Sequence, residues 1–185
     1  TPTEQKPNPP KVVPRPEGAS LTLPSGFSAT LFASGGFKRP RNLAQAPNGD
    51  IFVVDSGPGS IWVLRDADKN GTIEDAERSE FATGLKQPFG IAFQKGAVYV
   101  ANTDAVVKFP YAAGDLKASA APVTVAPLPN GPAGHWTRNI AFTPDGKRLI
   151  TAGSDGAAII WEVARAQALR RIDVGGRVMS LCMLD

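Results

Sequence analysis

The single histidine of the chain, His135, stands in the stretch GHWTRNIAF (134–142), three residues before Arg138. An imidazole whose pKa lies near neutral pH can act as a general base. The stretch follows a Pro/Gly-rich loop and leads into an apolar run that predicts a β-strand. Residue type alone favours a polar loop residue, whereas the position before a strand favours a base at the mouth of a site. Both interpretations stay open at this point.

A second group of residues has the spacing of a metal site. Residues 66–77, DADKNGTIEDAE, match the twelve-residue pattern of a calcium-binding loop. Gly71 would make its sharp turn, and Ile73 would be its apolar anchor. Because no flanking helices are predicted, the alternative is an acidic, solvated loop that only resembles the motif. A bound Ca²⁺ would stiffen the connection between strands. The predicted oxygen ligands are Asp66, Asp68, Asn70, Thr72 and Glu77.

The elements that would position these residues repeat along the chain. Three segments each contain two apolar strands joined by a tight turn: PRNLAQAPNGDIFVVDS, PFGIAFQKGAVYVANT and TRNIAFTPDGKRLITAGS. Leu43, Ile91 and Ile140 are equivalent, at spacings of 48 and 49 residues. A period of about 40–50 residues built from strand pairs is typical of β-propeller blades.

Further strands complete each repeat. Third strands are predicted at 60–65, 105–110 and 157–163, and fourth strands at FSATLFA (27–33), RSEFATG, APVTVAPL and QALRRIDV. The predicted fold class is therefore all-β: a partial β-propeller of about three four-stranded blades plus the start of a fourth at RVMSLCMLD (177–185). Trp161 is expected in the core, and Cys182 is expected as a buried structural thiol.

The predicted organisation is a Pro-rich, disordered tail or linker (1–20) followed by the partial propeller (21–185). Blade 1 covers about 27–65, blade 2 about 79–110 and blade 3 about 122–163. The net charge is +3, and the basic residues are scattered, which argues against a nucleic-acid partner. No apolar run is long enough for a membrane span. An open array leaves an unpaired edge, so we expect a fragment of a longer protein or self-association through the open blade edge.

Several stretches, taken in order, resemble one known family. They are LPSGFSATLFASGGFKRPRNLAQAPNGDIFVVDSGPGSIWVLRDAD, GLKQPFGIAF, VYVANTDAVVKFPY and GHWTRNIAFTPDGKRL. Over about residues 21–150 they resemble the sorbosone dehydrogenase-like branch of the soluble PQQ-dependent sugar dehydrogenases. The resemblance implies a six-bladed, periplasmic or secreted propeller that binds pyrroloquinoline quinone (PQQ), with Ca²⁺ assisting. It also implies an aldose-type sugar substrate and an electron acceptor.

The same resemblance implies roles for individual residues. In that family, a histidine in an H-x-x-R segment is the general base, and here His135 and Arg138 match it. His135 would take the proton of the sugar hydroxyl while hydride passes to the C5 carbon of the quinone. Gln87, just before the inner strand of blade 2, is by position a candidate contact for substrate or cofactor.

The last part of the chain departs from this pattern. Residues 151–185 resemble a WD40 repeat, and the basic residues that later blades would supply to PQQ are not in this sequence. Whether the chain is an enzyme therefore stays open. One alternative is a non-enzymatic, WD40-like interaction propeller. Another is a lactonase-like hydrolase whose metal would be held at the strand ends by Asn42, Asn102, Asp104 and Asn139.

Overall fold

The computed structural model describes residues 11, 13–14, 16–129, 137–153 and 155–181. The chain divides into two units, Thr1–Leu31 and Phe32–Asp185. The described residues of the first unit form no helix or strand, so every described strand belongs to the second unit. The predicted all-β class is confirmed, because the described residues hold strands and a single short 3-10 helix, η1 (Asp75–Glu77).

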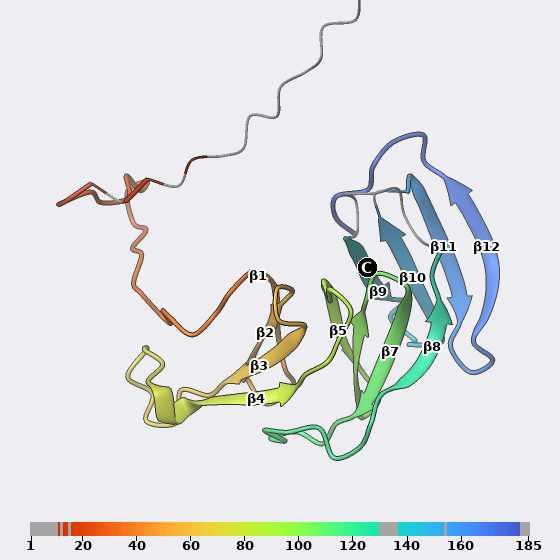
Figure 1. The fold of residues 1–185 in the computed structure, drawn as a ribbon, viewed down its shortest axis with the longest axis horizontal. Coiled ribbons are helices and arrows are strands. Elements are labelled where there is room, and N and C mark those ends of the chain that lie inside the picture. The colour runs from red at the N-terminus through yellow and green to blue at the C-terminus, as the bar shows by residue number, and fades with distance from the viewer. Residues whose placement is uncertain (1–10, 12, 15, 130–136, 154, 182–185) are drawn as a thin grey trace, which may run out of the picture. The chain divides into compact units, whose positions relative to one another are not determined.

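The strands form three four-stranded antiparallel sheets, and within each sheet they follow one another in chain order (Figure 1). The first sheet contains β1 (Pro40–Gln45), β2 (Ile51–Asp55), β3 (Ser60–Leu64) and β4 (Arg78–Ala82). The second contains β5 (Gly90–Gln94), β6 (Ala97–Ala101), β7 (Ala105–Pro110) and β8 (Val123–Pro127). The third contains β9 (Arg138–Phe142), β10 (Arg148–Gly153), β11 (Ala157–Glu162) and β12 (Gln167–Asp173).

The hairpin between β5 and β6 shows how the turn residues fix the register. Only Lys95 and Gly96 separate the two strands, and their φ angles are 46° and 72°. Two consecutive positive φ values define the primed turn whose twist matches that of antiparallel strands. The turn therefore pairs Gln94 with Ala97 and aligns the rest of the hairpin.

Apolar side chains fill the contacts between neighbouring sheets. Between the first and second sheets, the Phe52 ring packs edge-on against Phe93 and Tyr111, with ring centroids 4.9 and 5.5 Å apart. Between the second and third sheets, the cluster includes Tyr99 and the buried Trp161. The indole N–H of Trp161 donates to Thr151 Oγ1 at 2.9 Å. The predicted core role of Trp161 is confirmed.

The inner strands approach one another closely. Strand β5 contacts both β1 and β9. A Cβ atom at Gly90 would lie 2.6 Å from the carbonyl oxygen of Arg138, which is closer than any real Cβ contact. Glycine at this position lets the backbones of two neighbouring blades come together.

The observed strands differ from the predicted strands and blade bounds in three places. Residues 27–33 form no strand, and Phe27 and Leu31 are 72% and 70% exposed, because the first sheet already has its fourth strand in β4. Strand β8 pairs with β7 and completes the second sheet, whereas the predicted bounds assign it to blade 3. Residues 177–181 form no strand, and Cys182 lies outside the described residues.

Candidate functional site

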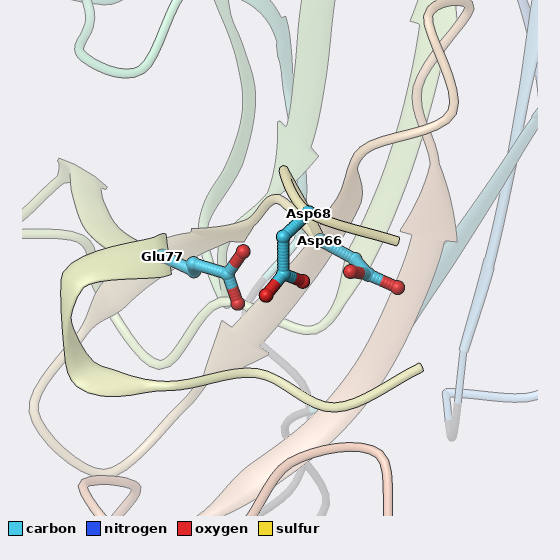
Figure 2. A group of neighbouring side chains, drawn as sticks. All are labelled: Asp66, Asp68 and Glu77. Atoms are coloured by element: carbon cyan, nitrogen blue, oxygen red, sulfur yellow. The ribbon is translucent and has the colours of Figure 1, made fainter. Parts of the chain in front are cut away.

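The predicted calcium loop joins β3 to β4 and includes η1. The carboxylates of Asp66, Asp68 and Glu77 lie side by side (Figure 2), and one oxygen of each is within 4.8 Å of one oxygen of the others. Backbone N–H groups orient two of them: Gly71 N donates to Asp66 Oδ2 at 3.0 Å, and Ala67 N donates to Glu77 Oε1 at 2.7 Å. The loop thus brings together residues eleven positions apart in the sequence.

Asn70, another predicted ligand, makes different contacts. Its Oδ1 accepts hydrogen bonds from Thr72 N at 2.7 Å and Thr72 Oγ1 at 2.6 Å. Its Nδ2 donates to Asp68 Oδ2 at 2.9 Å. The side chains of Asn70 and Thr72 therefore bond to each other, and Asn70 links this pair to the carboxylate group.

The donor chemistry of the loop suits a hard divalent cation. Residues 66–77 contain five carboxylates against one lysine. Carboxylate and carbonyl oxygens are the ligands that Ca²⁺ prefers. The three gathered carboxylates fit such an ion.

Of the predicted catalytic pair, the structure describes only Arg138. His135 lies outside the described residues. Arg138 begins β9 and is 2% exposed, so its guanidinium does not face an open mouth. Its Nη1 donates to Thr137 O and its Nη2 to Pro129 O, both at 3.0 Å. These two carbonyls stand on either side of residues 130–136, so Arg138 bonds to both flanks of the segment that contains His135.

Gln87 stands at the same end of the sheets, three residues before β5. Its side chain is exposed, and its φ of 48° lies in the left-handed region. A non-glycine residue held in that region costs about 1–3 kcal/mol, and such residues gather at functional sites. The next residue towards the N-terminus, Lys86, pairs with Asp104 at 2.6 Å.

A basic rim lies around the starts of β1 and β5, and the repeat pattern did not predict it. Arg41 is the extra residue of a β-bulge between Pro40 and Asn42, a feature that can redirect a side chain. Its guanidinium lies 5.7 Å from the centre of the Phe89 ring. The rim comprises Lys38, Arg39, Arg41 and Lys86. The run FKRPR before the first inner strand was the sequence signal for it.

Three of the four strand-end residues of the lactonase-like alternative have side-chain partners of their own. Asp104 pairs with Lys86, and Asn139 Nδ2 donates to Met179 O at 2.8 Å. Asn42 Oδ1 accepts from Leu43 N at 2.9 Å. Asn102 is 6% exposed, and its Oδ1 accepts no hydrogen bond from the described residues. These contacts hold the side chains locally and give that alternative no support.

Three successive four-stranded antiparallel sheets with their first strands in contact define a β-propeller-type protein with an acidic loop at one end and a basic rim at the other. Residues 21–168 match the family model described as TrAA12-like. The chain belongs to the TrAA12-like family.

Solved structures share this fold. The holo form of the pyranose dehydrogenase PQQ domain from Coprinopsis cinerea is 16% identical, with a TM-score of 0.61 over 71% of this chain and 35% of that chain. The calcium structure of a Trichoderma reesei protein of Carbohydrate-Active Enzymes Family AA12 is 17% identical, with a TM-score of 0.62 over 75% of this chain and 39% of that chain. The chain thus spans less than two-fifths of either structure.

A curated relative matches a shorter stretch. The small ribosomal subunit protein RACK1 of Medicago sativa is 32% identical over 62 residues, which are 32% of this chain and 19% of that protein. Within the described residues, no helix is long and apolar enough to cross a membrane.

Proposed function

We propose that the chain is part of a PQQ-dependent sugar dehydrogenase that oxidises an aldose or a sorbosone-type sugar. The observation that carries the proposal is the family match over residues 21–168. The fold that the chain shares with the holo form of a pyranose dehydrogenase PQQ domain supports it. The proposed location is periplasmic or extracellular, and the proposed partners are a sugar and an electron acceptor.

The basic rim fits the cofactor chemically. PQQ is a planar tricarboxylate, and the rim offers the Arg41 guanidinium beside the aromatic ring of Phe89. Arg41 and its neighbours Lys38 and Arg39 would hold carboxylates, while Gln87 would contact substrate or cofactor. Bound PQQ would supply the acceptor for the hydride.

His135 would accept the proton of the sugar hydroxyl as the general base, as the family resemblance implies. Arg138 would support it indirectly, because its guanidinium bonds to the carbonyls of Pro129 and Thr137 on both sides of the His135 segment. Arg138 is therefore proposed as a positioning residue.

Sugar-dependent dye reduction tests this function. The chain, supplied with PQQ, Ca²⁺ and an aldose, should reduce an artificial acceptor, and His135→Ala should lower the rate about 10²–10⁴-fold, the usual loss with a general base. The matched control is Arg165→Ala, an exposed change beside β11, which should keep the wild-type rate. Dye reduction that His135→Ala leaves unchanged would contradict the role of His135. No PQQ-dependent turnover by the wild type would favour the second candidate, a non-enzymatic WD40-like interaction propeller, which the RACK1 likeness keeps open.

The loop at 66–77 is proposed to bind Ca²⁺ through Asp66, Asp68 and Glu77, with Asn70 and Thr72 completing the ligand set. A ligand that binds only the folded state stabilises it by about 2.7 kcal/mol at a hundredfold excess over its Kd. Chelation should therefore lower the melting temperature of the wild type and leave that of Asp68→Asn unchanged. An equal melting temperature of the wild type with Ca²⁺ and with chelator would contradict the site.

A further inference from the structure

The segment Phe32–Phe37, here called the clasp segment, lies on the face of the first sheet that points away from the second sheet. Side chains alternate along a strand: Phe52 and Val63 pack towards the second sheet, while Val53 and Leu64 belong to a separate apolar cluster. Ala33 and Phe37 of the clasp segment cover this separate cluster. The Phe37 ring stands edge-on to Trp62, with centroids 6.3 Å apart.

The proposed calcium loop fastens the clasp segment. The N–H of Ile73 donates to the carbonyl oxygen of Phe32 at 2.8 Å, and the Ile73 side chain is buried in the same apolar cluster. Ile73 lies between the predicted ligands Asp68 and Glu77. Fixing those carboxylates around an ion would therefore fix the position of Ile73.

Arg78, the residue directly after Glu77, makes a second attachment. Its Nη1 donates to Gly35 O at 2.8 Å and its Nη2 to Ser34 O at 2.6 Å. Its guanidinium carbon lies 5.5 Å from the centre of the Phe37 ring. Hydrogen bonds from a charged donor are roughly twice as strong as neutral ones, so Arg78 is a firm attachment that moves with the end of the loop.

The two residues that follow the clasp segment, Lys38 and Arg39, are held at the opposite end of the sheet. Lys38 N and Arg39 N donate to the Asp55 carboxylate at 2.7 and 2.6 Å, and Asp55 is fully buried. Asp55 pairs with Pro40 and with Ser60, whereas the calcium loop follows Leu64 at the other end of β3. The clasp segment leads directly into these two residues and thus links the acidic loop to the basic rim.

We propose that cation binding by the 66–77 loop holds the clasp segment on the first sheet and thereby steadies the basic rim, so that the metal regulates the cofactor end from the opposite edge of the blade. This inference rests on the calcium site of the proposed function. It requires that the contacts of Ile73 and Arg78 pass the effect of the ion to residues 32–39.

Amide hydrogen exchange of the full chain tests the proposal, together with a direct calorimetric titration of Ca²⁺. Peptides covering residues 32–39 should exchange about tenfold more slowly with Ca²⁺ than with chelator, because a bound ion suppresses local opening. Arg78→Met should still bind Ca²⁺ but lose most of this difference. The control, Arg165→Met, should keep both Ca²⁺ binding and the difference in exchange at residues 32–39.

The outcomes separate the two claims. No heat of Ca²⁺ binding would overturn the calcium site itself. Ca²⁺ binding with unchanged exchange at 32–39 would overturn the clasp and leave the site standing. If Arg78→Met does not fold, Asp68→Asn replaces it, and this variant should show the slow-exchange state neither with nor without Ca²⁺. If the exchange rate at residues 32–39 still depends on Ca²⁺ in Asp68→Asn, that result would also contradict the proposal.

Discussion

Arg138 and Gln87 both stand just before or at the start of an inner strand, yet their side chains have opposite surroundings. Arg138 is buried on the carbonyls of Pro129 and Thr137, while Gln87 is exposed with a left-handed backbone. The repeat predicts where each residue stands along its blade. It could not predict the burial of Arg138, because the two acceptors belong to loop backbone whose path no residue pattern specifies.

The acidic loop was more predictable. Asp66, Asp68 and Glu77 come together as the motif indicates, since a tight turn at Gly71 brings the ends of twelve residues close. The bonds between Asn70 and Thr72 were not predictable from the motif, because it describes ligands facing an ion and not the contacts of the side chains with one another.

Asp50 offers a residue-scale prediction of pH dependence. Burial raises the pKa of its carboxyl group, but hydrogen bonds from Arg65 and Asn48 and the charge of Arg65 outweigh burial and lower the pKa below the ordinary 3.8. A depressed folded-state pKa gives stability that is present above the unfolded value and lost as pH falls through the folded value. Asp50→Asn should therefore cost about 1–3 kcal/mol at pH 7 and progressively less below pH 3.8, measured by urea unfolding at several pH values. Asp173→Asn, in an exposed pair with Arg171, is the control, and an equal cost for both would contradict the role of Asp50.

At the scale of elements, hairpins were predictable and blade bounds were not. The strand at 105–110 has the predicted limits, because short alternating runs between turn residues specify both ends. The assignment of 27–33 as a strand was wrong, and the strand at Val123–Pro127 belongs to the second sheet. A strand needs an edge to pair with, and sequence alone does not say which edge is open.

At the contact between β5 and β9, replacing Gly90 should destabilise the fold. Gly90→Ala places a methyl group 2.6 Å from the Arg138 carbonyl oxygen, so β5 and β9 must move apart. The expected cost is about 1–3 kcal/mol, as for other overpacked contacts, measured as a lower melting temperature. Gly176→Ala meets nothing within 4 Å and has no positive φ, so it should be nearly neutral. Equal melting temperatures of the two variants would contradict the close packing of the inner strands.

At the scale of the whole molecule, Leu43, Ile91 and Ile140 occupy equivalent positions on the same face of their respective blades. Ile91 and Ile140 pack against the preceding sheet and are only 7% and 9% exposed, whereas Leu43 is 65% exposed. The repeat predicts an apolar residue at all three positions, but it does not predict that Leu43 is exposed, because it does not say which part of the first sheet has a packing partner.

We propose that Leu43, an exposed apolar residue on the face of the first sheet that the clasp segment only partly covers, takes part in self-association. Sedimentation of the chain should then depend on concentration, and Leu43→Lys should weaken the association, because a buried charge is costly. Val123→Lys changes another exposed apolar residue, 56% exposed on the outer strand β8, and should sediment as the wild type does. A wild-type chain that stays monomeric at every concentration would rule out this proposal.

Equilibrium binding of PQQ to the folded chain, followed by fluorescence with and without Ca²⁺, tests the central claim most directly. We predict saturable binding that Arg41→Ser weakens about tenfold or more, since a charge-assisted hydrogen bond contributes about 1.5–3 kcal/mol, while Arg165→Ser leaves it unchanged. Failure of the wild type to bind PQQ, or equal affinities of all three proteins, would contradict the assignment of the basic rim as the cofactor end of this propeller.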